Sequence, residues 1–198
     1  MTLTSTRTLA AANVPSWLRG QSVATKVLAV LLGTLVLAAS SHVSVPMVPV
    51  PMSMQTLAVT LVGALYGWRL GGLTILVWLA LGALGLPVFA GGTGGYARFL
   101  GPTGGYLFAF PIAGALTGWL VEHGWNGRRF PLALAAMLLG NALCLLVGAA
   151  WLASMVGMQK AVAVGVMPFV PGALLKSVLG AALLKVVDGF SGKGQDAG

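Results

Sequence analysis

The sequence predicts an all-α integral membrane protein with six transmembrane helices, and three observations carry this prediction. Of the 198 residues, 58% are hydrophobic and only 7% are charged, against about 25% charged in an ordinary soluble domain. The charged residues leave four long apolar gaps, 27–68, 70–97, 99–121 and 130–159. A spanning helix needs about 20 mostly apolar residues, and the first gap has room for two such helices.

The helices follow from these gaps in chain order. The first is predicted over about 25–41, and the prolines Pro46, Pro49 and Pro51 separate it from the second, because proline removes a backbone donor. The second and third are predicted over about 54–69 and 71–88. The fourth and fifth are predicted over about 104–121 and 131–156, and the sixth over about 170–188, next to Pro171.

The net charge of +8 follows membrane topology rather than indicating nucleic acid as a partner. With the N-terminus inside, eight cations face the cytoplasm: Arg7, Arg19, Lys26, Arg69, Arg128, Arg129, Lys185 and Lys193. Only Arg98, Lys160 and Lys176 are then directed outward, which favours an N-in, C-in arrangement in a bacterial cytoplasmic (inner) membrane. An alternative interpretation of residues 1–40 as a signal peptide would leave five spans and place the C-terminal lysines outside.

The chain reads as one membrane domain with two polar ends. Residues 1–22 are predicted to form a mobile cytoplasmic arm, residues 23–190 the six-helix domain, and residues 191–198 a disordered cytoplasmic tail. The connections between helices are too short to fold separately. Function is therefore expected within the bundle and its loops.

Two outward loops stand out by composition. Loop His42–Met54 lies within SHVSVPMVPVPMSM (41–54), whose prolines hold it extended and whose valines and methionines make it apolar, as expected of a lid. Residues 91–106 read GGTGGYARFLGPTGGY, with TGGY at 93–96 and again at 103–106. Glycines at this density allow tight turns and a close approach of the backbone to another group.

The sequence offers no set of residues for catalysis, metal binding or nucleotide binding. Its three carboxylates, Glu122, Asp188 and Asp196, lie outside the middle of the predicted spans, which disfavours coupling to ions. Leu175 stands where a P-loop preceding Lys176 would need glycine. The two histidines and the single cysteine form no metal site of usual spacing. We therefore expect neither enzymatic activity nor a cofactor.

Binding of a small anion remains the favoured interpretation. The outward half holds three cations and no carboxylate, so Lys176 is expected to meet a negatively charged ligand, or alternatively to reach the lipid headgroups. Aromatic residues near the glycine loop are expected to form an apolar slot, or else an interfacial belt: Phe89, Tyr96, Phe99, Tyr106 and Phe108. Gln55, Thr56 and Asn141 are expected either to donate hydrogen bonds to the ligand or to bond neighbouring helices. Cys144 is expected to be a small packing residue.

Three stretches of the sequence resemble motifs of a known protein family. GLPVFAGGTGGYARFLGPTGGYLFAF (85–110) resembles the central signature of the BioY family, the biotin-specific substrate-binding (S) components of energy-coupling factor (ECF) transporters. VPVPMSMQTLAVTLVGALYG (48–67) and MPFVPGALLKSVLGA (167–181) are similar to that family's proline-rich loop and last-helix motif. Lys176 matches the family lysine, whereas Ala173 stands where the family has aspartate.

The resemblance implies an S-component bundle that captures biotin from outside and works with a membrane coupling subunit and ATPase subunits. Membrane lipid is the other expected partner. Alternatives that stay open are another small vitamin or carboxylate as ligand, a solitary biotin transporter or facilitator, and a non-transport membrane protein. Small residues on the first helix, Ala29 and Gly33, are expected either to dock the coupling subunit or to pack within the chain. The candidate substrate-binding set is Gln55, Phe89, Gly91, Gly92, Thr93, Gly94, Gly95, Tyr96, Arg98, Thr103, Gly104, Gly105, Tyr106, Asn141, Ala173 and Lys176.

Overall fold

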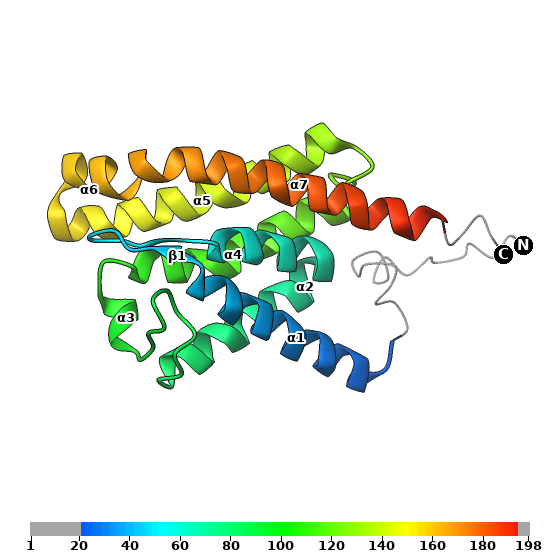
Figure 1. Cartoon of the computed structure of the whole chain (residues 1–198), viewed down its shortest axis with the longest axis horizontal. Helices are drawn as coiled ribbons and strands as arrows, with labels where there is room; N and C mark the ends of the chain where they lie inside the picture. The colour runs from blue at the N-terminus through cyan, green and yellow to red at the C-terminus, as the bar shows by residue number, and fades with distance from the viewer. Residues whose placement is uncertain (1–20, 194–198) are drawn as a thin grey trace, which may run out of the picture.

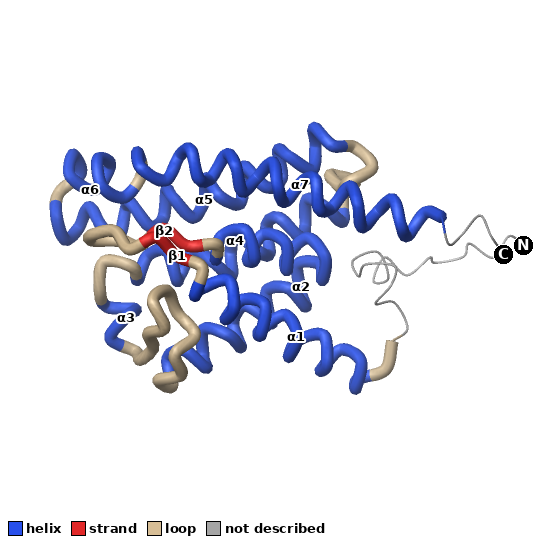
Figure 2. The backbone as a smooth tube through the Cα atoms, viewed as in Figure 1, coloured by secondary structure: helices blue, strands red, loops and turns tan. Residues whose placement is uncertain are grey.

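The computed structural model describes residues 21–193 as an elongated bundle of helices (Figure 1). The predicted arm 1–22 and tail 191–198 fall largely outside the described residues, although the last helix reaches Lys193. Helix α1 begins and helix α7 ends at one pole of the bundle. The opposite pole, which we call the lid end, carries the loops described below (Figure 2).

The long helices match the predicted spans closely. They are α1 (Val23–His42), α2 (Gln55–Ala83), α4 (Gly104–Glu122), α5 (Phe130–Val156) and α7 (Val170–Lys193). Ser22 caps the start of α1 by accepting a hydrogen bond from the backbone N–H of Thr25 at 3.3 Å. Helix α5 ends where Gly157 adopts a φ of 83°, a conformation that favours glycine. Five helical stretches of the described chain are long and apolar enough to cross a membrane.

Helix α2 contains both the second and the third predicted helices. A sharp change of direction at Gly67, with φ 78° and ψ 169°, separates residues 55–66 from 68–83. The boundary predicted at residues 69–71 therefore lies at this glycine instead, since only glycine adopts this backbone conformation without strain. The third predicted helix also ends early, at Ala83 rather than at residue 88, because Gly85 turns the chain with a φ of 101° before Pro87.

Close backbone contacts explain the small residues of this region. Helix α2 packs mainly against α4, and α4 also packs against α5. A Cβ at Gly63 would overlap the backbone of Gly114 in α4, and a Cβ at Gly118 would lie 2.7 Å from the backbone nitrogen of Trp68. Glycine at these positions lets the helices cross with their backbones in direct contact.

The lid end is built from short elements. Strands β1 (Ser44–Val45) and β2 (Met52–Ser53) pair in antiparallel register and form a hairpin, shown in red in Figure 2. This hairpin is the extended lid that the prolines predicted. The glycine-rich loop contains the short helix α3 (Ala97–Leu100), and α6 (Met158–Gly165) and η3 (Met167–Phe169) lead into α7.

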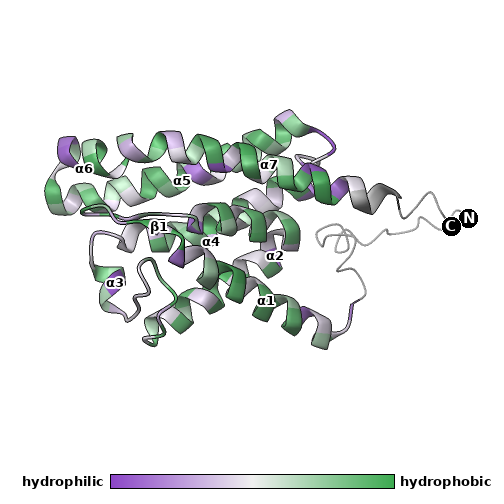
Figure 3. Ribbon diagram, viewed as in Figure 1, coloured by the Kyte–Doolittle hydropathy of each residue, from purple (hydrophilic) through white to green (hydrophobic). Residues whose placement is uncertain are grey.

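The surface and the core divide as they do in a membrane protein. Large apolar side chains are exposed along α1 and α7, among them Leu31, Leu35 and Leu175, and apolar residues dominate the outer faces of the helices in Figure 3. Such faces suit contact with lipid chains. Inside, Trp78 is fully buried, packs edge-on to Phe89 at a ring distance of 5.5 Å, and donates to the carbonyl oxygen of Val88 at 3.0 Å.

Candidate functional site

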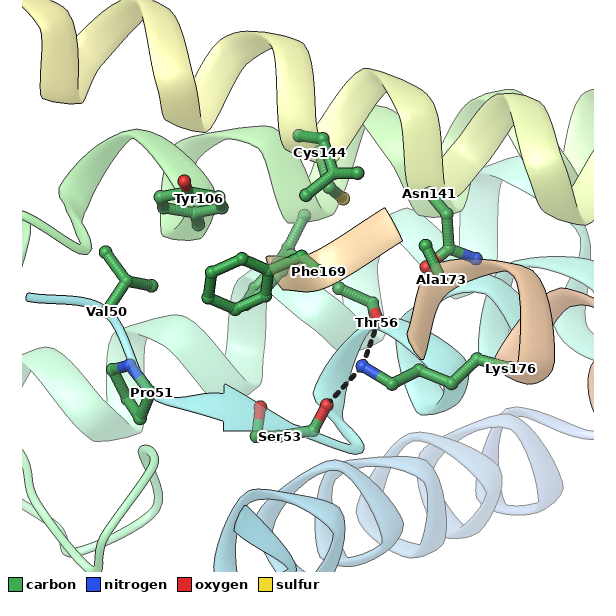
Figure 4. Close-up of a pocket in the computed structure, with 12 residues that line it drawn as sticks. Val50, Pro51, Ser53, Thr56, Tyr106, Asn141, Cys144, Phe169, Ala173 and Lys176 are labelled. Carbon is green, nitrogen blue, oxygen red and sulfur yellow. Dashed lines mark hydrogen bonds between the residues drawn. The ribbon is translucent and has the colours of Figure 1, made fainter. Parts of the chain in front are cut away.

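A chamber lies just beneath the lid hairpin, between α2, α4, α5, η3 and α7 (Figure 4). Its empty space is about 460 Å³, counting its opening to solvent. Its walls are mostly apolar, with five side chains that carry a hydroxyl, amide or ammonium group. The residues that line it are Val50, Pro51, Ser53, Thr56, Tyr106, Phe110, Asn141, Cys144, Leu145, Phe169, Ala173 and Lys176.

Lys176 brings a charged group into this chamber. Its residue is 8% exposed, and the ammonium donates to the carbonyl oxygen of Ser53 at 2.6 Å and to Thr56 Oγ1 at 3.2 Å. Helix α7 positions the lysine, because η3 and Pro171 start that helix at the lid end and Lys176 follows less than two turns later. The side chain therefore points into the protein, not toward the lipid headgroups.

No carboxylate neutralises this ammonium within the described residues. The two acidic side chains of residues 21–193 are engaged elsewhere: Glu122 accepts from the backbone N–H of Trp68, and Asp188 from that of Gly127. Both lie in the helix ends and loops away from the lid. An amine held by two neutral acceptors in a partly enclosed space favours an electronegative ligand as its further partner.

Asn141 occupies the α5 wall of the chamber and is 2% exposed. Its Nδ2 donates to the carbonyl oxygen of Met137 at 3.0 Å and to Ser177 Oγ at 3.2 Å. The amide donors of Asn141 are thus occupied by protein groups. The bond to Ser177 of α7 is the link to a neighbouring helix that the sequence offered as the alternative to donation to a ligand.

Aromatic rings close the chamber on the side of α4. Tyr106 and Phe169 lie with ring centroids 6.4 Å apart. The hydroxyl of Tyr106 donates to the carbonyl oxygen of Gly165 at 2.7 Å, which ties α4 to the end of α6. Because this bond satisfies the hydroxyl, the ring face remains as an apolar surface for a ligand.

A second, smaller cavity lies between the lid and the glycine-rich loop. Its empty space is about 270 Å³, and it is lined by Pro51, Gln55, Phe89, Ala90, Thr93, Arg98, Thr103 and Leu107. Gln55 accepts from Ser53 Oγ at 2.7 Å through Oε1, while its buried Nε2 has no partner among the described residues. Pro51 lines both cavities, so the lid strand separates them.

The structure thus divides the candidate substrate-binding set into three groups. Tyr106, Asn141, Ala173 and Lys176 line the chamber. Gln55, Phe89, Thr93, Arg98 and Thr103 line the second cavity. The remaining residues line neither cavity: Gly91, Gly92, Gly94, Gly95, Tyr96, Gly104 and Gly105.

The glycines of the third group act through the backbone. Gly91, Gly92 and Gly95 have positive φ angles, which suit glycine in turns. A Cβ at Gly94 would overlap the carbonyl oxygen of Leu86, and one at Gly105 would overlap Trp151. Tyr96 is 74% exposed and projects from the loop. These residues shape the loop around the second cavity.

The aromatic cluster and the proposed docking residues also have defined places. Phe99 packs against Phe89 and Phe108, with ring centroids 5.7 and 5.6 Å apart, so these rings support one another beside the loop. Ala29 and Gly33 are buried, and a Cβ at Gly33 would lie 2.7 Å from Thr74 and 2.8 Å from Tyr66. Packing inside the chain explains the small size of Gly33, and docking of a coupling subunit stays a prediction.

Sequence reasoning missed most of the chamber wall. Cys144, expected to be a packing residue, is buried with its side chain in the wall. Ser53 offers a backbone carbonyl, which no side-chain pattern marks. Thr56, expected to donate to the ligand or to bond a neighbouring helix, accepts from Lys176 of α7. Phe169 follows Pro168 within MPFVP, and this proline-flanked segment is a local signal of a turn from which that part of the wall could have been predicted. No group of three or more metal-binding side chains occurs among the described residues.

Comparison with known proteins places the chain among biotin transporters by similarity. The model of the BioY family matches residues 8–191. A probable biotin transporter BioY of Pyrococcus horikoshii is 38% identical, over 75% of this chain and 87% of that protein. The biotin transporter BioY of Rhizobium etli is 36% identical, over 73% and 81%. The crystal structure of the S-component for biotin from an ECF-type ABC transporter aligns with a TM-score of 0.73 and 26% identity, covering 85% of this chain and 94% of that one.

Proposed function

The chain belongs to the BioY family, and from this membership we propose that it binds biotin and serves in its uptake as the substrate-specific subunit of an ECF-type transporter. It is a multi-pass protein of the cytoplasmic membrane. The observation that carries the binding role is the chamber beneath the lid, which holds a buried ammonium without a carboxylate partner among the described residues. A compact, polar, monoanionic vitamin matches this combination of apolar walls and a single positive charge.

The further features of this function are part of the proposal. The lid end faces outward and both chain termini face the cytoplasm, as the distribution of lysine and arginine favours. A membrane coupling subunit and ATPase subunits supply the energy, and the chain itself has no catalytic role. Residues of the chamber and of the second cavity contact the vitamin, and the glycine-rich loop shapes the second cavity.

Direct binding tests the ligand. The purified chain in detergent is titrated with radiolabelled biotin, and unlabelled biotin, lipoate, thiamine and riboflavin are added as competitors. We expect saturable binding that only biotin and its close analogues displace. Absence of saturable binding, or displacement by another vitamin at lower concentration, would refute biotin as the ligand.

Cys144 provides an independent test of the location, since it is the only cysteine of the chain and lies in the chamber wall. A small maleimide reaches its thiol only through the chamber. At a biotin concentration 100 times the Kd, the free fraction falls to about 1%, so labelling slows about 100-fold. A matched control places the cysteine at exposed Lys160 in a Cys144→Ala background, where biotin should leave the rate unchanged. Equal rates at Cys144 with and without bound biotin would place the ligand elsewhere.

A further inference from the structure

The connection between α4 and α5, residues 123–129, lies directly against the last helix. A Cβ at Gly127 would overlap the backbone of Leu184 and Lys185 in α7. The backbone N–H of Gly127 also donates to Asp188 Oδ2 at 2.7 Å. The connection and residues 184–188 are therefore in direct contact, toward the pole where α7 ends (Figure 1).

This contact brings three cationic side chains into one region. Arg128 and Arg129 directly follow Gly127, and Lys185 is itself part of the contact. All three residues are exposed. The ammonium of Lys185 lies 6.0 Å from the ring centroid of Phe130, the first residue of α5. The positive charges of the connection and of α7 thus gather on one surface.

These cations lack anionic partners. Among the described residues, none of the three forms an ion pair, and Asp188 is the one carboxylate at the contact, where it accepts from Gly127. Glu122, the other carboxylate of the described chain, accepts from the backbone N–H of Trp68 at 3.2 Å. The surface therefore carries an excess of positive charge, and guanidinium groups in particular suit the oxygens of a phosphate.

An apolar surface next to these cations indicates which phosphate fits. Leu183, Val186 and Val187 are 41%, 54% and 42% exposed on the same stretch of α7. A free phosphate ester would engage the cations and leave these side chains uncovered. A phospholipid covers both parts, because its phosphate meets the cations while its acyl chains lie along the helix.

We propose that Arg128, Arg129 and Lys185 bind the phosphate of an anionic phospholipid, whose acyl chains lie along α7. The proposed topology places this lipid in the cytoplasmic leaflet. The site lies toward the pole opposite the lid end, so it is separate from the chamber and does not depend on the identity of the vitamin. A zwitterionic lipid fits less well, because its own cation opposes the three of the protein.

Retention of lipid by the purified full chain tests the site. The protein in detergent is mixed with equal amounts of phosphatidylglycerol and phosphatidylcholine, and native mass spectrometry gives the ratio of the two lipids retained. The wild type should favour phosphatidylglycerol. A cation near an anionic headgroup contributes about a fivefold preference, so Arg128→Gln, Arg129→Gln and Lys185→Gln should each lower the ratio about fivefold, and the triple variant about 100-fold.

Lys26→Gln is the matched control. It removes an exposed cation from the first turn of α1, at the same pole, but from a helix that packs against α2 rather than against α7. It should change the ratio less than twofold. Asp188→Asn keeps an acceptor for the Gly127 N–H and removes the opposing charge, so it should raise the ratio.

Four results would each overturn the proposal. They are a wild type without preference for phosphatidylglycerol, an equal loss in Lys26→Gln and Arg128→Gln, a lower ratio in Asp188→Asn, and displacement of the lipid by glycerophosphoglycerol. The last compound is the same headgroup without acyl chains, so its success as a competitor would assign the cations to a free phosphate ester. Equal loss in the control would assign the preference to the total charge of this pole.

Discussion

Replacing Lys176 with methionine should separate ligand binding from folding. The substitution keeps the length and apolar stem of the side chain and removes the ammonium that bonds Ser53 and Thr56. Hydrogen bonds to a charged group contribute about 1.5–3 kcal/mol each. Loss of one such contact to the ligand therefore weakens biotin about 10- to 150-fold, at about 1.4 kcal/mol per tenfold.

The ligand-free protein should respond much less. Lys176 is largely buried without a carboxylate partner among the described residues, so its removal also abolishes a desolvation cost. Loss of the bonds to Ser53 and Thr56 destabilises the fold, whereas loss of the desolvation cost of the buried ammonium stabilises it. Because these two effects oppose each other, we expect the melting temperature without ligand to shift by only a few degrees.

Thermal unfolding in detergent, with and without biotin, measures both effects. At 100 times the wild-type Kd, biotin stabilises the wild type by about 2.7 kcal/mol, and a 30-fold weaker variant by about 0.9 kcal/mol. Lys160→Met is the control, because it removes the same charge from an exposed position of the lid end, and it should keep the full stabilisation. A Lys176→Met protein that melts much lower yet keeps the full biotin shift would show that the lysine is purely structural.

Three further predictions concern the fold and the topology. Gly63→Ala should lower the melting temperature by several degrees, because its Cβ would overlap the backbone of Gly114. The control Gly72→Ala should be neutral or stabilising, since the nearest atom to its Cβ lies 3.9 Å away. Equal effects of the two substitutions would contradict the close crossing of α2 and α4. Tyr106→Phe should cost about 1 kcal/mol in unfolding experiments through the lost bond to Gly165, and an unchanged stability would contradict that bond. In a Cys144→Ala background, a cysteine at Val48, which is 93% exposed, should react with an impermeant maleimide added to intact cells. A cysteine at exposed Arg128 should react only after the cells are lysed. The reverse pattern would show that the lid end faces the cytoplasm.

The sequence predicted the helices well because lipid imposes a simple rule on them. Apolar runs between charges indicated every long helix, and the prolines of the lid indicated an extended segment that forms β1 and β2. The turn within α2 was misplaced by a few residues, since Arg69 looked like the boundary, whereas the chain turns at Gly67, with a φ of 78°, where α2 lies against Gly118 of α4.

The site was predicted less completely, for a physical reason. Glycine-rich sequence indicates close approach but does not say to what, and Gly94 and Gly105 approach the protein's own Leu86 and Trp151. Lys176 was recognised by its charge, yet its partner Ser53 lies 123 residues away and contributes a backbone oxygen. The wall position of Cys144 depends on the rotation of α5, which its uniformly apolar sequence does not specify.

The bond between Lys176 and Ser53 joins the helix that carries the ammonium to the second strand of the hairpin. A stronger bond between these two residues holds the hairpin more firmly over the chamber. A ligand in the chamber that also binds the Lys176 nitrogen changes the strength of this bond, and so changes how firmly the hairpin is held. Thermodynamic reciprocity then requires that occupancy of the chamber and the position of β2 influence each other by the same factor. A partner protein that pulled on the hairpin would thereby loosen the vitamin without touching it.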